Sequence, residues 1–320
     1  KGNGVDPLDV IEKFGADALR FGLAYLTTET QDVKMPVEFE CPHCQALIPQ
    51  TKKNRTLPRV QCEKCHQPFS TQWAEKPEDK ALPRAGISNE RFELGRRFCN
   101  KLWNASRFSL MNLASEPGRP GPGASEHGAN AEGARQTAGG TPRLAAGSQG
   151  ELMLEDRWLL SRLATVTRDV TDDLQSYRFA EAARTLYAFA WNDFCDYYVE
   201  ITKARFKDPA QRDVAQQVLA HALDSLLRLL HPMIPFLTEE VWQLLNAVAP
   251  FRGLTDAAPS AESICVASWP TADEARIDPT IEEQFADFQA VLGAVREIRM
   301  AQNIPPRTPL EFRVTCSAAT

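Results

Sequence analysis

The sequence contains no run of apolar residues long enough to cross a bilayer, so we expect a soluble, globular protein with no membrane partner. Positive charge is not in excess, because the sequence has 36 lysines and arginines but 42 aspartates and glutamates, which gives a net charge of −6. This balance argues against a uniformly basic nucleic-acid-binding protein but allows a local basic face. Histidines number five, and no nucleophile–base pair, glycine-rich phosphate loop or carboxylate dyad stands out. We therefore expect no acid–base catalysis by this chain alone.

Half of the eight cysteines form two Cys-x-x-Cys pairs, Cys41 with Cys44 and Cys62 with Cys65. Each pair can hold one metal ion from a single turn, and the residues between the pairs could form a β-hairpin that brings both to the same ion. Four thiolates leave no open position, which predicts a structural zinc site. The alternative is two disulfides or four unused thiols. The other cysteines are scattered singly, which favours a reduced, intracellular protein and hence zinc.

Composition divides the chain into four parts. The segment that contains the two cysteine pairs, here called the zinc segment, has few apolar residues, so it would need a metal ion to fold. A tract within the third part is dominated by glycine, alanine, proline and serine, and we expect it to be a disordered insertion. The expected boundaries are 1–35, 36–87 for the zinc ribbon, 88–250 for a helical bundle with the insertion at 115–150, and 251–320 for a C-terminal connecting segment.

Hydrophobic periodicity predicts a mainly α fold with an inserted small β zinc ribbon and a short α+β segment at the C-terminal end. The first helix is expected to break at 15–17, and residues 263–270 are predicted to form a strand. Asp278 and Pro279 predict the start of another long helix. Large rings at 191–198 are expected to fill a bundle core. The five helices of the bundle are predicted at 88–113, 154–177, 179–206, 214–230 and 236–248.

One face of the predicted helix 88–113 carries side chains suited to RNA. At 100° per residue, Arg97, Lys101, Asn104 and Phe108 lie on one narrow stripe, with Arg107 at its edge. Cations can hold phosphates, an amide can read a base edge, and an aromatic ring can stack on an unpaired base. A solvated charged face with a half-buried phenylalanine would show the same spacing. The spacing alone leaves both interpretations open.

Five segments, met in order along the chain, resemble the class I aminoacyl-tRNA synthetases, and the run FCNKLWNASRF at 98–108 is similar to the valyl-tRNA synthetase family. The run KGNGVDPLD at 1–9 resembles the residues that follow the KMSKS signature. The zinc segment and the tract at 115–150 depart from this resemblance. The remaining similar segments are 14–21, 191–203 and 230–242.

The resemblance implies the end of a catalytic domain followed by a helical anticodon-binding bundle. It implies a cytoplasmic, monomeric ligase that uses ATP and magnesium to attach valine to its tRNA. The KMSKS and HIGH signatures and the editing domain would precede the chain, and a coiled-coil arm would follow it. The piece alone should therefore not aminoacylate, and ATP and valine would bind through the missing catalytic domain.

The resemblance also implies roles for particular residues. Lys1, Gly2 and Asn3 would border the ATP site, and the stripe on helix 88–113 would face the anticodon loop of a valine tRNA. Two alternatives stay open at this point. One is an isoleucyl- or leucyl-type synthetase, and the other is a non-enzymatic zinc-ribbon and helix-bundle protein that binds nucleic acid.

Overall fold

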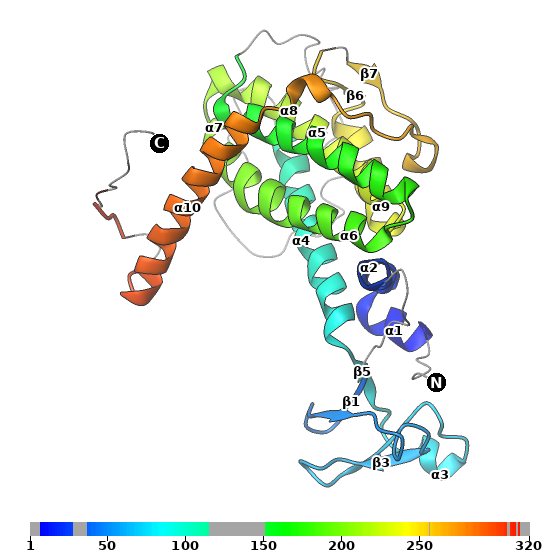
Figure 1. The fold of residues 1–320 in the computed structure, drawn as a ribbon. Coiled ribbons are helices and arrows are strands. Elements are labelled where there is room, and N and C mark those ends of the chain that lie inside the picture. The colour runs from blue at the N-terminus through cyan, green and yellow to red at the C-terminus, as the bar shows by residue number, and fades with distance from the viewer. Residues whose placement is uncertain are drawn as a thin grey trace.

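The computed structural model describes residues 7–27, 37–114, 151–255, 257–305, 308–311 and 313. A body of packed helices carries a small β module at the far end of one long helix (Figure 1). No helix among the described residues is both long and apolar enough to span a membrane. The predictions for Lys1, Gly2 and Asn3 and for the tract 115–150 fall outside the described residues.

The first two helices are α1 (Pro7–Phe14) and α2 (Ala16–Leu26), separated by Gly15 with a positive φ of 91°. The expected break is therefore confirmed, because a left-handed backbone favours glycine and cannot continue a helix. Helix α2 is anchored to α9 (Pro235–Val248) by Asp17. Its carboxylate accepts hydrogen bonds from the first free amides of α9, Phe236 N at 3.2 Å and Leu237 N at 2.6 Å.

Helix α4 (Glu90–Leu113) runs from the β module into the helical body and packs closely on α2 (Figure 1). Asn89 caps its N-terminus by accepting a hydrogen bond from the Arg91 amide at 2.8 Å. At Gly95 a Cβ atom would lie only 2.5 Å from the Ala18 carbonyl oxygen. The two helix backbones thus approach as closely as glycine allows.

The remaining bundle helices surround one apolar core. Residues 179–205 form a nearly continuous helical segment with a π-helical stretch, η2, in the middle. Of the rings predicted to fill the core, Phe194 and Tyr198 are buried, and Trp191 and Tyr197 are partly buried and pack against it. The helices are α5 (Leu154–Gln175), α6 (Phe179–Ala188), η2 (Phe189–Tyr198), α7 (Val199–Arg205), α8 (Pro209–Leu230) and α9.

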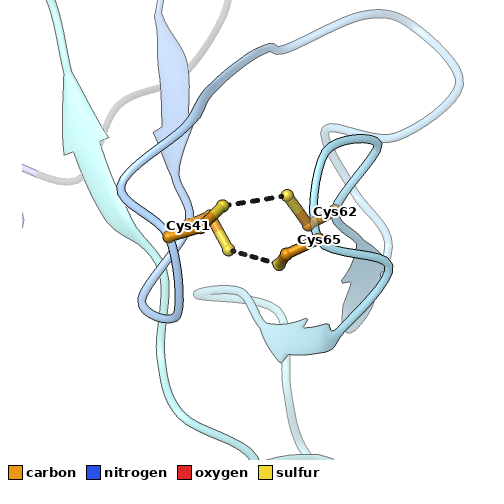
Figure 2. A group of neighbouring side chains, drawn as sticks. Cys41, Cys62 and Cys65 are labelled. Carbon is orange, nitrogen blue, oxygen red and sulfur yellow. Dashed lines mark hydrogen bonds between the residues drawn. The ribbon is translucent and has the colours of Figure 1, made fainter.

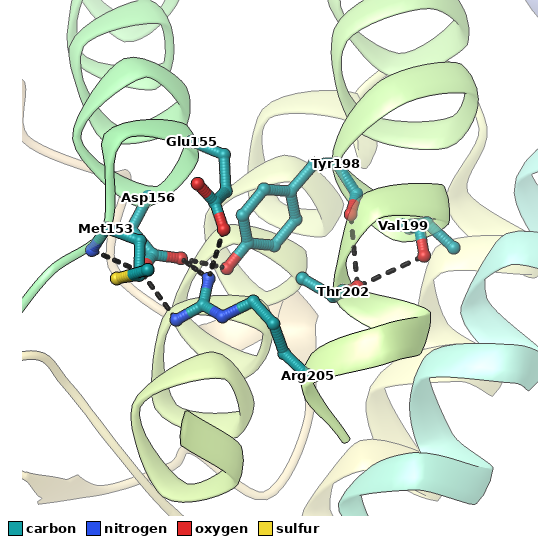
Figure 3. Close-up of polar contacts among 7 residues, drawn as sticks. All are labelled: Met153, Glu155, Asp156, Tyr198, Val199, Thr202 and Arg205. Carbon is teal, nitrogen blue, oxygen red and sulfur yellow. Dashed lines mark hydrogen bonds and ion pairs between the residues drawn. The ribbon is translucent and has the colours of Figure 1, made fainter. Parts of the chain in front are cut away.

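A buried ionic network joins α5 to η2 and α7 (Figure 3). The Arg205 guanidinium donates to both carboxylate oxygens of Asp156, at 2.6 and 2.8 Å, and to Glu155 at 3.2 Å. The Tyr198 hydroxyl donates to Asp156 at 2.8 Å, and burial together with Asp156 raises the Tyr198 pKa well above its usual value. The Met153 amide donates to the same carboxylate at 3.0 Å, so the Asp156 carboxylate accepts four hydrogen bonds from three residues.

The prediction of a strand at 263–270 is wrong, because residues Ile264–Val266 form the 3₁₀ helix η3. A strand needs a neighbouring strand to form hydrogen bonds with its backbone, but the polar groups at the start of this segment bond to a side chain of α9. The Glu239 carboxylate accepts from the Ile264 amide at 3.1 Å and from the Ser263 hydroxyl at 2.9 Å. The short strands of this region are instead β6 (Phe251–Arg252) and β7 (Ala258–Pro259).

The last helix, α10 (Pro279–Ala301), begins where the sequence predicted. Asp278 accepts from the Thr280 amide at 3.1 Å and the Ile281 amide at 3.2 Å, and a short 3₁₀ turn, η4 (Glu274–Arg276), precedes it. The Phe285 ring stacks on Trp158 of α5 with centroids 3.6 Å apart. This contact holds the first half of α10 on the bundle, and its second half extends away from it (Figure 1).

Replacing Gly95 by alanine tests the close contact between α2 and α4. We expect Gly95→Ala to lower the free energy of unfolding by about 1–3 kcal/mol, since the new methyl group would meet backbone atoms of Ala18 that cannot rotate away. Gly293→Ala in α10 is the control, because no atom lies within 4 Å of its Cβ position. Urea titration should show the control unchanged or stabilised by up to about 1 kcal/mol. Equal effects of both variants would contradict the close packing.

Replacing Asp156 tests the buried network. We expect Asp156→Ala to lower the free energy of unfolding by about 3–5 kcal/mol, because it leaves Arg205 buried without its bidentate partner. Glu181→Ala, which breaks the exposed pair with Arg184, should cost no more than about 1 kcal/mol. Combining Asp156→Leu with Arg205→Met should recover most of the loss in thermal or urea unfolding. A double variant as unstable as Asp156→Ala would show that the charges themselves stabilise the fold.

Candidate metal centre and candidate nucleic-acid interface

The β module contains two hairpins, and each cysteine pair occupies the turn of one of them. Strands β1 (Glu38–Glu40) and β2 (Leu47–Pro49) flank the first pair, and β3 (Arg59–Gln61) and β4 (Pro68–Ser70) flank the second. The hairpin predicted between the two pairs is therefore wrong in its position. The Cys-x-x-Cys segment already turns the chain by itself, so each pair closes its own hairpin.

The two turns have the same local structure. The residue after each pair, Gln45 or His66, has a left-handed backbone with φ of 58°. In each turn this residue donates its amide to the first cysteine's carbonyl, at 2.8 Å in the first turn and 2.9 Å in the second. The first cysteine's amide in turn donates to the residue that precedes the returning strand, at 2.9 and 3.0 Å. This shared geometry aims both sulfurs of each pair to one side.

Two further elements complete the module. Strand β5 (Gly86–Ser88) pairs with β1 to give a three-stranded sheet in the order β2-β1-β5, and it leads directly into α4. The short helix α3 (Pro77–Lys80) lies between β4 and β5 in the chain. Phe39 and Phe69, one from each hairpin, are buried against each other with ring centroids 5.9 Å apart. The apolar core of the module is otherwise small.

The four sulfurs of Cys41, Cys44, Cys62 and Cys65 face one another across the two turns (Figure 2). All lie within 4.8 Å of one another, with Cys41 3.7 Å from Cys65 and Cys44 3.6 Å from Cys62. A disulfide needs sulfurs about 2 Å apart, so these are free thiols. Around a metal with bonds of about 2.3 Å, tetrahedral sulfurs lie roughly 3.8 Å apart. The cluster therefore fits a single tetrahedral metal ion.

The electrostatics of the cluster also suit a metal. The backbone amides of Cys65 and Lys64 point to the Cys62 sulfur and lower the pKa of that thiol to about 6. The Gln67 amide acts in the same direction on Cys65, but burial and the neighbouring thiols raise the Cys65 pKa to about 12. The backbone amides around the cluster thus favour the thiolate form that binds a metal ion.

The two histidines beside the cysteines do not join the cluster. His43 Nε2 lies 3.2 Å from the Pro68 carbonyl oxygen, and His66 is exposed. The donor set is therefore four sulfurs, and it leaves no position for a substrate.

The stripe predicted on α4 is partly exposed and partly engaged by the bundle. Arg97 is the most open, with 71% of its side chain exposed and an ion pair to Glu93 at 3.3 Å. Asn104 and Arg107 are also exposed. Cations and an amide thus reach solvent on one face of α4, as the sequence predicted.

Lys101 lies deeper than the rest of the stripe. Its ammonium group bonds the Asp196 carboxylate at 2.6 Å and sits 3.9 Å from the centroid of the Trp191 ring. Both partners belong to η2, so the charge of Lys101 is largely balanced within the protein. This lysine is placed to orient Trp191 and Asp196 beside the stripe more than to meet a phosphate.

Phe108 is half-buried, between the bundle and solvent. Its ring centroid lies 6.3 Å from that of Phe206, and the Lys203 ammonium lies 5.3 Å from its ring. Lys203 is a neighbour of the stripe that could not be predicted from the sequence. Residues on two different helices meet only through tertiary packing, so no spacing rule could have found the pair.

Comparison with known proteins identifies the family. The family described as the anticodon-binding domain of tRNA ligase matches residues 156–314. The valine–tRNA ligase of Rhodopirellula baltica is 53% identical over all 320 residues of this chain. Over its whole length, this chain is similar to one segment of a valine–tRNA ligase. The resemblance seen in the sequence is thereby confirmed, and the isoleucyl- or leucyl-type and non-enzymatic alternatives are not favoured.

The chain spans about a quarter of the length of these valine–tRNA ligases. It covers 28% of the Rhodopirellula protein, 24% of the Thermotoga maritima protein at 32% identity, and 25% of the Gloeobacter violaceus protein at 34% identity. The last two matches include 95% and 96% of this chain. Among solved structures, the ternary complex of LeuRS with tRNA and LeuAMS from Agrobacterium radiobacter K84 matches with a TM-score of 0.43 and 16% sequence identity. The match covers 86% of this chain and 22% of the LeuRS chain. That likeness is too low to bear on fold or function.

The anticodon-domain match begins at residue 156, so it covers the bundle from α5 onward. Helix α4, with the stripe, and the β module lie before it. Similarity to the valine–tRNA ligases includes both, since the Rhodopirellula match extends over the whole chain.

Loss of one cysteine tests the metal centre. We expect the purified chain to contain one thiolate-bound metal ion, measured by plasma mass spectrometry, and Cys62→Ser to lose it. Proteases should then cut within residues 37–88, because the module's small core cannot hold its fold without the ion. Cys265→Ser, which changes an exposed cysteine outside the cluster, should keep the metal. A metal-free, protease-resistant wild-type chain would contradict the assignment.

Proposed function

We propose that this chain is the anticodon-recognising part of an enzyme that attaches valine to its tRNA at the expense of ATP. The observation that carries the proposal is the exposed face of α4, where Arg97, Asn104 and Arg107 reach solvent beside the half-buried Phe108. The chain's identity to valine–tRNA ligases supports the choice of valine. The activation of valine, with ATP and magnesium, belongs to the catalytic domain of the complete enzyme.

The stripe divides into two kinds of side chain. Arg97 and Arg107 would contact phosphates of the anticodon loop, and Asn104 would bond a base edge. Phe108 would stack on an unpaired base with its open face, while Phe206 and the bundle support the other. Lys101, already paired with Asp196, would hold the neighbouring surface in position.

The metal centre would hold zinc as a structural ion. Four thiolates in a tetrahedron are the donor set that zinc prefers, and no position is open for catalysis. Lys1, Gly2 and Asn3 remain proposed as the border of the ATP site. We also propose a monomeric enzyme that acts in the cytoplasm.

Removing the ring of Phe108 in the complete enzyme tests the proposal. We expect Phe108→Ala to raise the KM for valine tRNA by the equivalent of about 1–3 kcal/mol, because one base loses its stacking partner. Valine-dependent exchange of pyrophosphate into ATP should stay unchanged, since that step needs no anticodon contact. Phe288→Ala, which removes an exposed ring on α10, is the control and should leave the KM unchanged.

Because Phe108 also packs against Phe206, a second variant avoids a folding defect. Arg97→Ala combined with Arg107→Ala changes exposed side chains only and should raise the same KM and weaken its dependence on salt. Unchanged tRNA kinetics in both variants would refute recognition by α4.

A further inference from the structure

The β module carries a second concentration of positive charge, separate from α4. The segment from Thr51 to Arg59 contains four lysines and arginines and no acidic residue. Residues 37–88 together hold eight basic and six acidic residues, whereas the whole chain has 36 and 42. The formal excess of the module is two positive charges, which four thiolates around one divalent ion would cancel. The positive charge is therefore concentrated in the 51–59 loop.

Three of these cations are open to solvent. Lys52, Lys53 and Arg59 are exposed. Within the described part of the chain, the ion pairs of the module's cations involve other residues, Lys76 with Glu78 and Arg84 with Asp9. Lys52, Lys53 and Arg59 thus form no ion pair within the described residues.

The loop has a fixed backbone shape. Asn54 Oδ1 accepts from the Thr51 amide at 2.7 Å, and Asn54 Nδ2 donates to the Pro49 carbonyl at 3.1 Å. The Arg55 amide donates to the Thr51 carbonyl at 3.1 Å. These bonds close the turn that carries Lys52 and Lys53, so less ordering is needed when a ligand binds.

A large aromatic side chain lies next to this loop. Trp73 is 48% exposed, and its amide donates to the Thr71 hydroxyl at 3.2 Å. The same hydroxyl donates to the Leu57 carbonyl at 2.5 Å, and the Thr71 amide donates to the Pro58 carbonyl at 3.0 Å. Thr71 thus ties the turn with Trp73 to the end of the basic loop. Cations beside an exposed indole, with its ring face and N–H donor, are suited to RNA.

We propose that Lys52, Lys53, Arg59 and Trp73 form a second RNA-contact surface, which binds the backbone of the same tRNA outside its anticodon loop. The proposal rests on the proposed function, because it takes the tRNA on α4 as its ligand. Strand β5 leads from the module into α4, and the middle of the stripe lies about 20 Å along the helix from Asn89. A tRNA held at the stripe by its anticodon loop could therefore reach the module, at the far end of α4, with a part beyond its anticodon stem-loop (Figure 1).

The surface would work through backbone contacts. The three cations would meet phosphates on a helical stem, and the Trp73 ring would pack on a ribose, with its N–H placed to bond a hydroxyl. Such contacts carry no base identity, so this surface would add affinity and leave the choice of tRNA to the anticodon.

The test compares two RNAs on the full chain: complete valine tRNA and its isolated anticodon stem-loop. Changing Lys52, Lys53 and Arg59 together to alanine should weaken binding of the complete tRNA three- to tenfold. The slope of log affinity against log salt should fall by about 2–3, one per lost phosphate contact. Trp73→Ala should weaken the same binding with little change in slope. Affinity for the isolated stem-loop should be unchanged, and bound metal should remain at one ion per chain.

A matched control removes equal charge elsewhere. Changing Arg157, Arg168 and Arg178 to alanine alters the net charge by the same amount on α5 and its C-terminal end, and it should leave both affinities unchanged. Module variants that bind complete tRNA like wild type would overturn the proposal, and the loop would then be a solvated face or a site for an acidic protein. Such a result would leave recognition by α4 intact, which its own variants test with the isolated stem-loop.

Discussion

The close approach of α2 and α4 at Gly95 determines where both candidate surfaces lie. Because a Cβ there would meet the Ala18 carbonyl, the backbones of α2 and α4 pack in direct contact at this point. The β module lies at the N-terminal end of α4, and the stripe lies along the middle of the helix. Asp17 fixes α2 in turn by accepting hydrogen bonds from the start of α9. The spacing between the two candidate surfaces therefore follows from one backbone contact and one helix cap.

The bundle that supports the stripe is held by apolar packing and by a few buried charges. The pair of Arg205 and Asp156 loses hydration on burial, and the network offsets this cost by satisfying both carboxylate oxygens with several donors. This arrangement ties α5 to α7, the helix whose Lys203 ammonium lies over the Phe108 ring. The packing around the candidate stripe thus depends on polar groups buried inside the bundle.

In the β module, by contrast, apolar packing contributes little to stability. Its core is small, and its hairpin strands are three residues long, so little apolar area is available to offset the entropy of ordering. A tetrahedral metal ion between the two turns would replace the missing core. A unit stabilised in this way can expose most of its surface, which is compatible with an open basic loop.

The sequence by itself determined the helical class, the break at Gly15, the cap at Asp278 and the four cysteines that cluster in the β module. These features depend on local backbone preferences and on the fixed spacing that a tetrahedral ion requires. Tertiary structure alone decided that Ile264–Val266 is not a strand, because the Glu239 carboxylate of α9 accepts hydrogen bonds from the Ser263 hydroxyl and the Ile264 amide. It also decided that Lys101 is paired with Asp196 and that Phe108 meets Lys203. Those partners are 95 residues apart in each case, and only the packing of the bundle brings them together.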